Sequence, residues 1–329
     1  MKLSKRITGI NSGGSDGWEV FYRARQMIAD GTPVLELTQG EHDIGTSAAI
    51  IAAMNASAMA GKTGYSPVQG ASDLRRAVAD RIQSRTGVAT TPDNILITPG
   101  GQAGLFASHY AVINDGDTAL FIDPYYATYP GTLRSVGAIA KPVVTKAVDY
   151  FAPQESALDA AAKGATSLLI NSPNNPTGVI YNHDTMMGIA RVCTDHDLWL
   201  ISDEVYDTQI WQGTHLTPRA LPDMAPRTMV VGSMSKSHAM TGSRVGWICA
   251  DAGVIENIFN LANNTTYGVS SFIQDAALFA LNQGHDVEEN VSAPFRRRRD
   301  ITLALLDGQN TIRVVPSQGA MYMMLDMHL

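Results

Sequence analysis

The sequence predicts an α/β fold in which a mainly parallel sheet is flanked by helices. Two observations support this prediction. Short apolar runs alternate along the chain with longer segments of helical periodicity, and the runs are continuously apolar rather than alternating between apolar and polar residues. A strand has this composition when helices cover both faces of its sheet, which is the arrangement of doubly wound parallel sheets.

The apolar runs are the predicted strands, and three helical segments accompany them. The predicted strands are Asn94–Thr98, Thr118–Asp123, Ser167–Asn171, Trp199–Tyr206, Thr228–Ser235 and Val245–Ala250. The predicted helices are Asp73–Gln83, with Ser72 as its N-cap, Gly101–Ile113 and Asn182–His196. Because the second of these helices is apolar nearly all round, it is expected to be buried.

The chain is expected to divide into a large domain and a smaller α/β domain built from both chain ends. Residues 1–44 are predicted to form an arm and one helix, and residues 45–285 the large domain. Residues 286–329 contain a charged helix, Asp286–Leu306, followed by two strand-like runs, Thr311–Pro316 and Ala320–Met327. This small domain looks incomplete, because a chain that stops on an apolar strand leaves an uncovered sheet edge.

Composition argues against several classes of function. The formal net charge of −7 disfavours nucleic acid or an anionic membrane as the main partner. No apolar run is long enough to span a membrane and no apolar stretch follows the basic start, so a cytoplasmic protein is predicted. Two cysteines, Cys193 and Cys249, exclude a disulfide framework, and the eight histidines lack metal-ligand spacing. Arg296–Arg299 is interpreted as a solvated or ion-paired helix face.

Four segments rich in glycine and polar residues follow the predicted strands, where ligands of open α/β sheets bind. The first, Thr98–Gly104, lies between a strand and a helix. Its glycines would let backbone N–H groups approach an anion at the helix N-terminus. A phosphate site and a plain tight turn are both open at this point, whereas Pro99 stands where a dinucleotide fingerprint has its first glycine.

The second and third segments each directly follow or end an apolar strand. Asn171–Gly178 reads NSPNNPTG, and its prolines and asparagines predict a rigid loop that either fixes an amide side chain or is a turn without function. In Ser202–Tyr206 (SDEVY), acidic Asp203 and Glu204 stand beside buried apolar positions and therefore need partners. A protonated heterocyclic nitrogen would be such a partner, and a salt bridge or a helix N-cap is the alternative.

The fourth segment, Ser233–Gly246, places a lysine between hydroxyl residues after a buried strand, with an arginine eight residues later. Partial burial and cationic neighbours lower the pKa of an amine, which makes Lys236 a candidate nucleophile. Arg244 offers a bidentate guanidinium for a phosphate, and Ser233 and Ser235 offer hydroxyl donors.

Together and in this order, NSPNNPTG, SDEVY and SMSKSHAMTGSRVGW resemble the class I/II aminotransferases of pyridoxal-phosphate (PLP) fold type I. The resemblance begins near Leu37 and extends to the end of the chain. It implies an aminotransferase that moves an amino group between an amino acid and a 2-oxo acid by a ping-pong mechanism. A C–S lyase, a synthase or an amino-acid oxidase with the same cofactor remains an alternative, as does, more remotely, a regulator that binds PLP without turnover.

The resemblance also implies roles for single residues. Lys236 would bind PLP covalently and move a proton, Asp203 would pair with the pyridinium nitrogen, and Asn175 and Tyr206 would contact the phenolic oxygen. Tyr126 would stack on the ring. Gly101, Gln102, Ser233, Ser235 and Arg244 would surround the phosphate, and Gly40 and Asn175 would lie near the substrate. Tyr65 would reach the phosphate of a second subunit, which implies a homodimer, and no metal is implied.

Two features depart from the family pattern. His42 stands where the family usually has proline, and a surface or capping role is favoured over contact with substrate. The family also carries a further C-terminal segment with an arginine that binds the substrate carboxylate, and this chain has no counterpart before Leu329. Either the sequence omits a tail or the protein recognises its substrate differently, and we expect the former.

Overall fold

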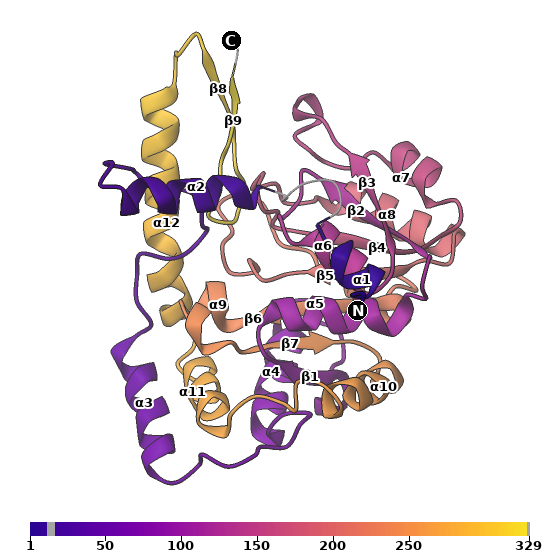
Figure 1. Ribbon diagram of the computed structural model, residues 1–329, viewed down its shortest axis with the longest axis vertical. Helices are drawn as coiled ribbons and strands as arrows, with labels where there is room; N and C mark the ends of the chain where they lie inside the picture. The colour runs from indigo at the N-terminus through magenta and orange to yellow at the C-terminus, as the bar shows by residue number, and fades with distance from the viewer. Residues whose placement is uncertain (12–16, 328–329) are drawn as a thin grey trace.

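The computed structural model describes residues 1–11 and 17–327, and its centre is a seven-stranded sheet with the order β1-β7-β6-β5-β4-β2-β3 (Figure 1). Strands β3, β2, β4, β5 and β6 run parallel to one another, and β7 runs antiparallel to both β6 and β1. The predicted α/β fold with a mainly parallel sheet is confirmed.

Each predicted strand of this sheet is present, with small changes at its ends. The strands are β1 (Ile95–Thr98), β2 (Thr118–Asp123), β3 (Ile139–Val144), β4 (Ala165–Asn171), β5 (Trp199–Asp203), β6 (Thr228–Ser233) and β7 (Gly246–Cys249). The predictions for β5 and β6 were too long, because a turn follows Asp203 and a short helix begins at Met234.

Strand β3 escapes prediction because it is an exposed edge strand, whereas the other edge strand, β1, is buried and was predicted. It contains Lys141 and Pro142, and most of its residues are exposed. Proline cannot donate to a strand ladder and is therefore tolerated mainly at sheet edges. A strand that is not covered on both faces lacks the continuous apolar run from which the other strands were predicted.

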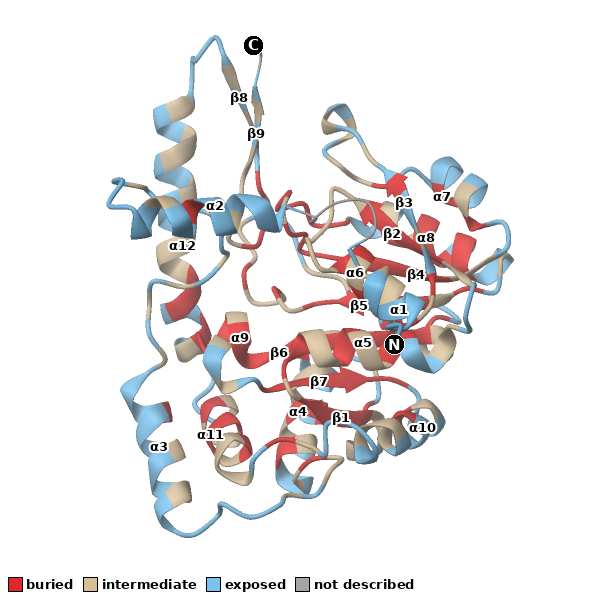
Figure 2. Ribbon diagram, viewed as in Figure 1, coloured by how far each residue is buried: buried red, intermediate tan, exposed pale blue. Residues whose placement is uncertain are grey.

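Helices cover both faces of the sheet, and alternate strand residues pack against them. On one face lie α5 (Gly101–Val112), α6 (Tyr129–Ser135) and α10 (Ala252–Asn263). On the other lie α4 (Ser72–Thr86), α7 (Glu155–Ala162), α8 (His183–Asp195) and α11 (Ser271–Leu281). In β4, for example, Leu168 and Ile170 belong to one apolar cluster and Leu169 belongs to the cluster on the opposite face. Figure 2 shows this buried core centred on the sheet.

Two helix predictions need correction. Helix α4 includes Ser72, and the cap position is Ala71, whose N–H donates to the Gln274 side chain of α11 at 2.7 Å. The predicted serine cap is therefore wrong, and the N–H of the cap residue is bonded instead to a side chain of another helix. Helix α5 is buried only on the face that contacts the sheet, since Tyr110 on it is exposed.

The two chain ends add elements outside the main sheet. They contain α1 (Lys5–Thr8), α2 (Trp18–Ala29), α12 (His285–Leu306), β8 (Ile312–Val315) and β9 (Met324–Met327), and β8 pairs antiparallel with β9. The arm thus holds a single-turn helix in addition to the one helix predicted. Helix α3 (Ala48–Met59) packs on α11, and α9 (Met234–Ser237) follows β6. Short 3-10 turns occupy Pro92–Asn94, Ala147–Asp149, Pro218–Ala220, Ala225–Arg227 and Thr241–Ser243.

Within residues 1–11 and 17–327, no helix has the length and apolarity needed to cross a membrane. Over the same ranges, no group of three His, Cys, Asp or Glu side chains is arranged to hold a metal ion. Cys193 and Cys249 are both buried and unbonded to each other, as expected from their apolar surroundings.

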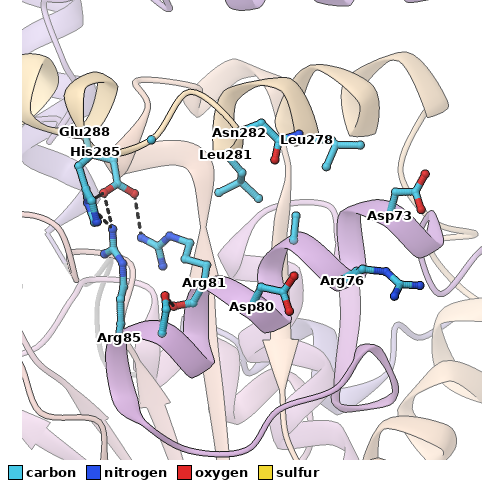
Figure 3. Close-up of a pocket in the computed structure, with 13 residues that line it drawn as sticks. Asp73, Arg76, Asp80, Arg81, Arg85, Leu278, Leu281, Asn282, His285 and Glu288 are labelled. Carbon is cyan, nitrogen blue, oxygen red and sulfur yellow. Dashed lines mark hydrogen bonds and ion pairs between the residues drawn. The ribbon is translucent and has the colours of Figure 1, made fainter.

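A buried set of ion pairs ties α4 to α12 and to the loop after β5. Arg81 donates to Asp207 at 2.7 Å. Arg81 also donates to Glu288 at 3.1 Å, and Arg85 contacts the same carboxylate (Figure 3). Burial opposes ionisation of Asp207, but Arg81 and Arg85 outweigh it and lower the pKa of this carboxyl to about 2. These pairs connect the sheet to the start of the long C-terminal helix.

The variant Asp207→Asn is expected to lower the free energy of unfolding by about 3 kcal/mol, because removal of one partner leaves buried cationic charge uncompensated. Urea denaturation at pH 7 would measure this change. Glu155→Gln is the matched control, since the pair of Glu155 with Arg191 is exposed and should contribute little. Equal stability of the two variants would show that the buried pairs do not stabilise the protein.

Candidate active site

A cavity of about 510 Å³ lies at the edge of the sheet where the parallel strands end. The strand register brings the predicted segments to this edge. Asn171 at the end of β4 is opposite Asp203 at the end of β5, and Ser233 at the end of β6 is opposite Gly246 of β7. Segments that are far apart in the sequence therefore meet around one cavity.

Most of the residues singled out from the sequence line this cavity. They are Gly40, Gly101, Gln102, Tyr126, Asn175, Asp203, Tyr206, Ser233, Ser235, Lys236 and Arg244. Tyr65 does not line it. That side chain is 90% exposed, and its ring packs edge-on against Tyr267 at a centroid distance of 5.1 Å.

Lys236 lies on α9, directly after β6, and its Nζ donates to the backbone oxygen of Gly40 at 2.6 Å. Burial lowers the pKa of this amine. The negative charge of Glu41 raises the pKa of Lys236, and the positive charge of Arg244 lowers it further. Both the burial and the neighbouring guanidinium favour the neutral amine, which is the nucleophilic and basic form.

Asp203 presents a buried carboxylate to the cavity. It accepts hydrogen bonds from the Tyr129 hydroxyl at 2.7 Å and from the Val205 N–H at 3.3 Å. Burial raises the pKa of Asp203 to about 6, although the Tyr129 hydrogen bond lowers it. In the described parts of the chain no cationic side chain is bonded to this carboxylate, so its negative charge is available to a cationic ligand group.

The residues around the start of α5 form a site that suits an anionic ligand group. Gly100 has a φ of +81°, and a side chain there would collide with the Arg244 guanidinium. A Cβ on Gly246 would lie 2.9 Å from the backbone nitrogen of Gly101. Glycine at both positions therefore lets the arginine and the helix N-terminus approach closely. The N–H groups of the first helical turn have no partner inside the helix and are therefore suited to bind an anion.

Hydroxyl and amide groups complete this anion-binding end of the cavity. Ser233 Oγ accepts from the Ser235 N–H at 3.3 Å, which leaves its own hydrogen free to donate. Arg244 is held by a hydrogen bond to the Thr241 carbonyl at 2.8 Å. The Gln102 side chain is already bonded to Thr128 and Thr132, so its backbone N–H is the part suited to a ligand.

Hydrogen bonds also hold the part of the cavity lining that contains Asn175 and Tyr206. The Asn175 N–H donates to the Asn171 side chain at 2.7 Å, and Asn171 in turn donates to the Asp203 carbonyl at 2.9 Å. The hydroxyls of Tyr206 and Tyr322 lie 2.9 Å apart. Burial raises the pKa of both phenols, that of Tyr322 to about 12, so both are neutral donors.

Sequence reasoning missed five aromatic residues that line the cavity: Trp18, Phe21, Tyr125, Tyr129 and Tyr322. Trp18 and Phe21 lie one helical turn apart on α2, and this spacing was a usable signal. Tyr129 follows Tyr126 by three residues and packs edge-on against it. Nothing in the sequence around Tyr322 distinguishes it from a strand residue.

The whole chain is similar to known aminotransferases. The family model described as aminotransferase class I and II matches residues 32–328. The chain is 36% identical to the arginine–pyruvate transaminase of Pseudomonas aeruginosa, over 99% of this chain and 83% of that protein. It is 32% identical to the aspartate/prephenate aminotransferase of Thermus thermophilus, over 98% of this chain and 84% of that protein.

Solved structures agree with the sequence relatives. The aspartate aminotransferase from Thermus thermophilus with maleate matches with a TM-score of 0.92 at 30% identity, over 99% of this chain and 85% of that one. The aspartate aminotransferase from Thermotoga maritima matches with a TM-score of 0.90 at 28% identity, over 97% of this chain and 84% of that one. The chain therefore belongs to the class I and II aminotransferases, a family of PLP-dependent enzymes, and is an aminotransferase.

Proposed function

We propose that this enzyme holds PLP in the cavity at the sheet edge and transfers an amino group from an amino acid to a 2-oxo acid by a ping-pong mechanism. The observation that carries the proposal is that the Lys236 amine, the Asp203 carboxylate and the anion-binding end with Arg244 all line one cavity. An amine, an acid and a phosphate site are the three groups that PLP needs in a protein.

The donor set fits the cofactor. Asp203 is a buried carboxylate without a bonded cation among the described residues, and a protonated pyridine nitrogen supplies that cation. Gly101, Gln102, Ser233, Ser235 and Arg244 supply backbone, hydroxyl and guanidinium donors for the phosphate. Asn175 and Tyr206 would donate to the phenolic oxygen, and Tyr126 would stack on the ring.

Bound PLP supplies the electron sink for the negative charge that develops at the substrate Cα. Asp203 holds the proton on the ring nitrogen, which keeps that sink effective. Lys236 would take the proton from the substrate Cα as a general base and would then donate it as a general acid. Gly40, together with Asn175, would orient the substrate beside this lysine.

We further propose a homodimer in which Tyr65 contacts the phosphate in the cavity of the second subunit. The 90% exposure of Tyr65 and its position outside the cavity of its own chain support this arrangement. Residues 45–285 are proposed as the PLP-binding domain, with 1–44 and 286–329 in the small domain, because β1 to β7 all lie in the first range. Amino-acid metabolism in the cytoplasm is the proposed setting.

Incubation with PLP and a panel of amino acids tests the function. A suitable donor, with no acceptor added, is expected to yield one equivalent of its 2-oxo acid per subunit, and a second 2-oxo acid should then allow turnover. The names of the two relatives make arginine and aspartate the first donors to try, with pyruvate and prephenate as acceptors. Release of ammonia or of an eliminated fragment instead would favour a lyase or an oxidase, and absence of any product would favour a regulator.

A further inference from the structure

The segment 40–46 runs alongside the loop that carries Lys236 and is bonded to it at several points. Lys236 Nζ donates to the Gly40 oxygen at 2.6 Å, and Thr46 donates to the Ala239 oxygen at 2.6 Å. Thr241 donates to the Glu41 carboxylate at 2.8 Å. These contacts join residues that are separated by about 200 positions in the sequence.

His42, within this segment, contacts the backbone of the same lysine. Its Nε2 lies 3.0 Å from the Lys236 carbonyl oxygen. Helix α9 has four residues, so the carbonyl groups near its end have no partner inside the helix. Within residues 1–11 and 17–327 no backbone N–H donates to this oxygen, and the other side-chain donor, Gln209 Nε2, is at 3.5 Å. His42 is therefore the principal donor to a carbonyl that the helix leaves unpaired.

The ring of His42 has a defined protonation state. Burial and the charge of Lys236 lower its pKa to about 4, against the opposing charges of Glu41 and Asp43. A neutral imidazole carries one N–H, and a carbonyl oxygen can only accept, so the hydrogen lies on Nε2. Nδ1 is buried and has no hydrogen-bond partner among the residues that the structure describes.

His42 also connects Lys236 to the long helix α12. Its ring packs edge-on against Phe295 at a centroid distance of 5.3 Å. The neighbouring Asp43 pairs with Arg298 of the same helix at 2.7 and 2.9 Å. His42 does not line the cavity, so it cannot act on a bound substrate directly.

We propose that His42 is a positioning residue for Lys236: its Nε2–H fixes the backbone of the lysine between segment 40–46 and α12, and thereby the place from which the amine moves a proton. This inference rests on the proposed role of Lys236. Proline, which the family usually has at this position, carries no donor, so the contact is a property of this chain rather than of the family pattern.

Two variants of similar size test the hydrogen bond. His42→Leu and His42→Gln both remove the ring contact with Phe295, but only glutamine keeps an N–H donor near the Nε2 position. With PLP bound, the first half-reaction is measured in single turnover over a range of donor concentrations, and the thermal midpoint is recorded for each protein. His42→Leu is expected to reduce the maximal rate about tenfold, which corresponds to about 1.4 kcal/mol, and to change the half-saturating concentration less than twofold. His42→Gln is expected to regain most of the rate.

The outcomes separate positioning from a general structural role. Equal rates for wild type and His42→Leu would overturn the inference alone. The inference would also be overturned if both variants lost the same factor in maximal rate together with a fall in thermal midpoint. A change in the half-saturating concentration alone, with the maximal rate unchanged, would overturn it as well. If wild type itself releases no 2-oxo acid in this assay, the proposed function fails and the inference fails with it.

Discussion

Lys236→Ala is expected to abolish the visible absorbance band of protein-bound PLP and to reduce amino-group transfer at least about 10,000-fold. The variant loses both the amine that binds the cofactor and the general acid–base, and the latter alone contributes up to about 10,000-fold. The amine is placed for both tasks, because it lines the cavity and its pKa is lowered by burial. Absorbance spectra of the purified variant after addition of PLP, followed by an assay with the best amino donor, would measure both effects.

Lys141→Ala is the matched control for this experiment. Lys141 lies on the exposed edge strand β3 and donates to the Ala161 carbonyl at 3.0 Å, away from the cavity. This variant should keep the band and the activity of wild type. A visible band that persists in Lys236→Ala, with the control unchanged, would mean that another amine binds the cofactor.

Asp203→Asn is expected to reduce the maximal rate by about 100- to 1,000-fold while PLP still binds. The amide is close in size to the carboxylate but cannot compensate a protonated ring nitrogen, so stabilisation of developing charge is lost, and such losses have this magnitude. The control is Glu204→Gln. Glu204 is the adjacent carboxylate in the sequence but is bonded to Thr217 at 2.7 Å and to His215 at 2.9 Å, outside the cavity.

In the protein without PLP, Asp203→Asn should increase the free energy of unfolding at high pH. Burial raises the pKa of Asp203 from 3.8 to about 6. Between these two pH values the carboxyl is protonated in the folded protein but ionised in the unfolded chain. The free energy of unfolding therefore falls as pH rises through this window, by roughly 3 kcal/mol in all. Asp203→Asn is therefore expected to be more stable than wild type at pH 8 and similar to it near pH 4. Equal urea midpoints at pH 8 would show that this carboxylate is already compensated in the folded protein.

Most of the central sheet could be predicted because its strands are buried on both faces. Such a strand consists of consecutive apolar residues, which can be recognised in the sequence. The same logic found the site, since Asp203 ends such a strand and Asn175 and Lys236 each follow one within a few residues. Strand β3 was missed because an exposed edge leaves no such record. Tyr322 was missed because tertiary packing brings its segment of the chain to the cavity, and no local pattern encodes that approach. Trp18 was missed although its one-turn spacing from Phe21 on α2 was a usable signal.

His42 illustrates the same limit in another way. The sequence favoured a surface or capping role over contact with substrate, and the ring does lie outside the cavity lining. It acts on a carbonyl near a helix end, as a cap does, but that helix is 194 residues away in the sequence. Capping is predictable from sequence only when donor and helix are neighbours along the chain.

The direction of β7 has a consequence for how the reactive groups stay together. β6 ends and β7 begins at the same edge of the sheet, where Ser233 pairs with Gly246. The single connection between these two residues contains both Lys236 and Arg244. The separation of amine and guanidinium is thus decided by a short stretch anchored at both ends on hydrogen-bonded strands. Loosening of the outlying β8–β9 pair would leave this connection in place.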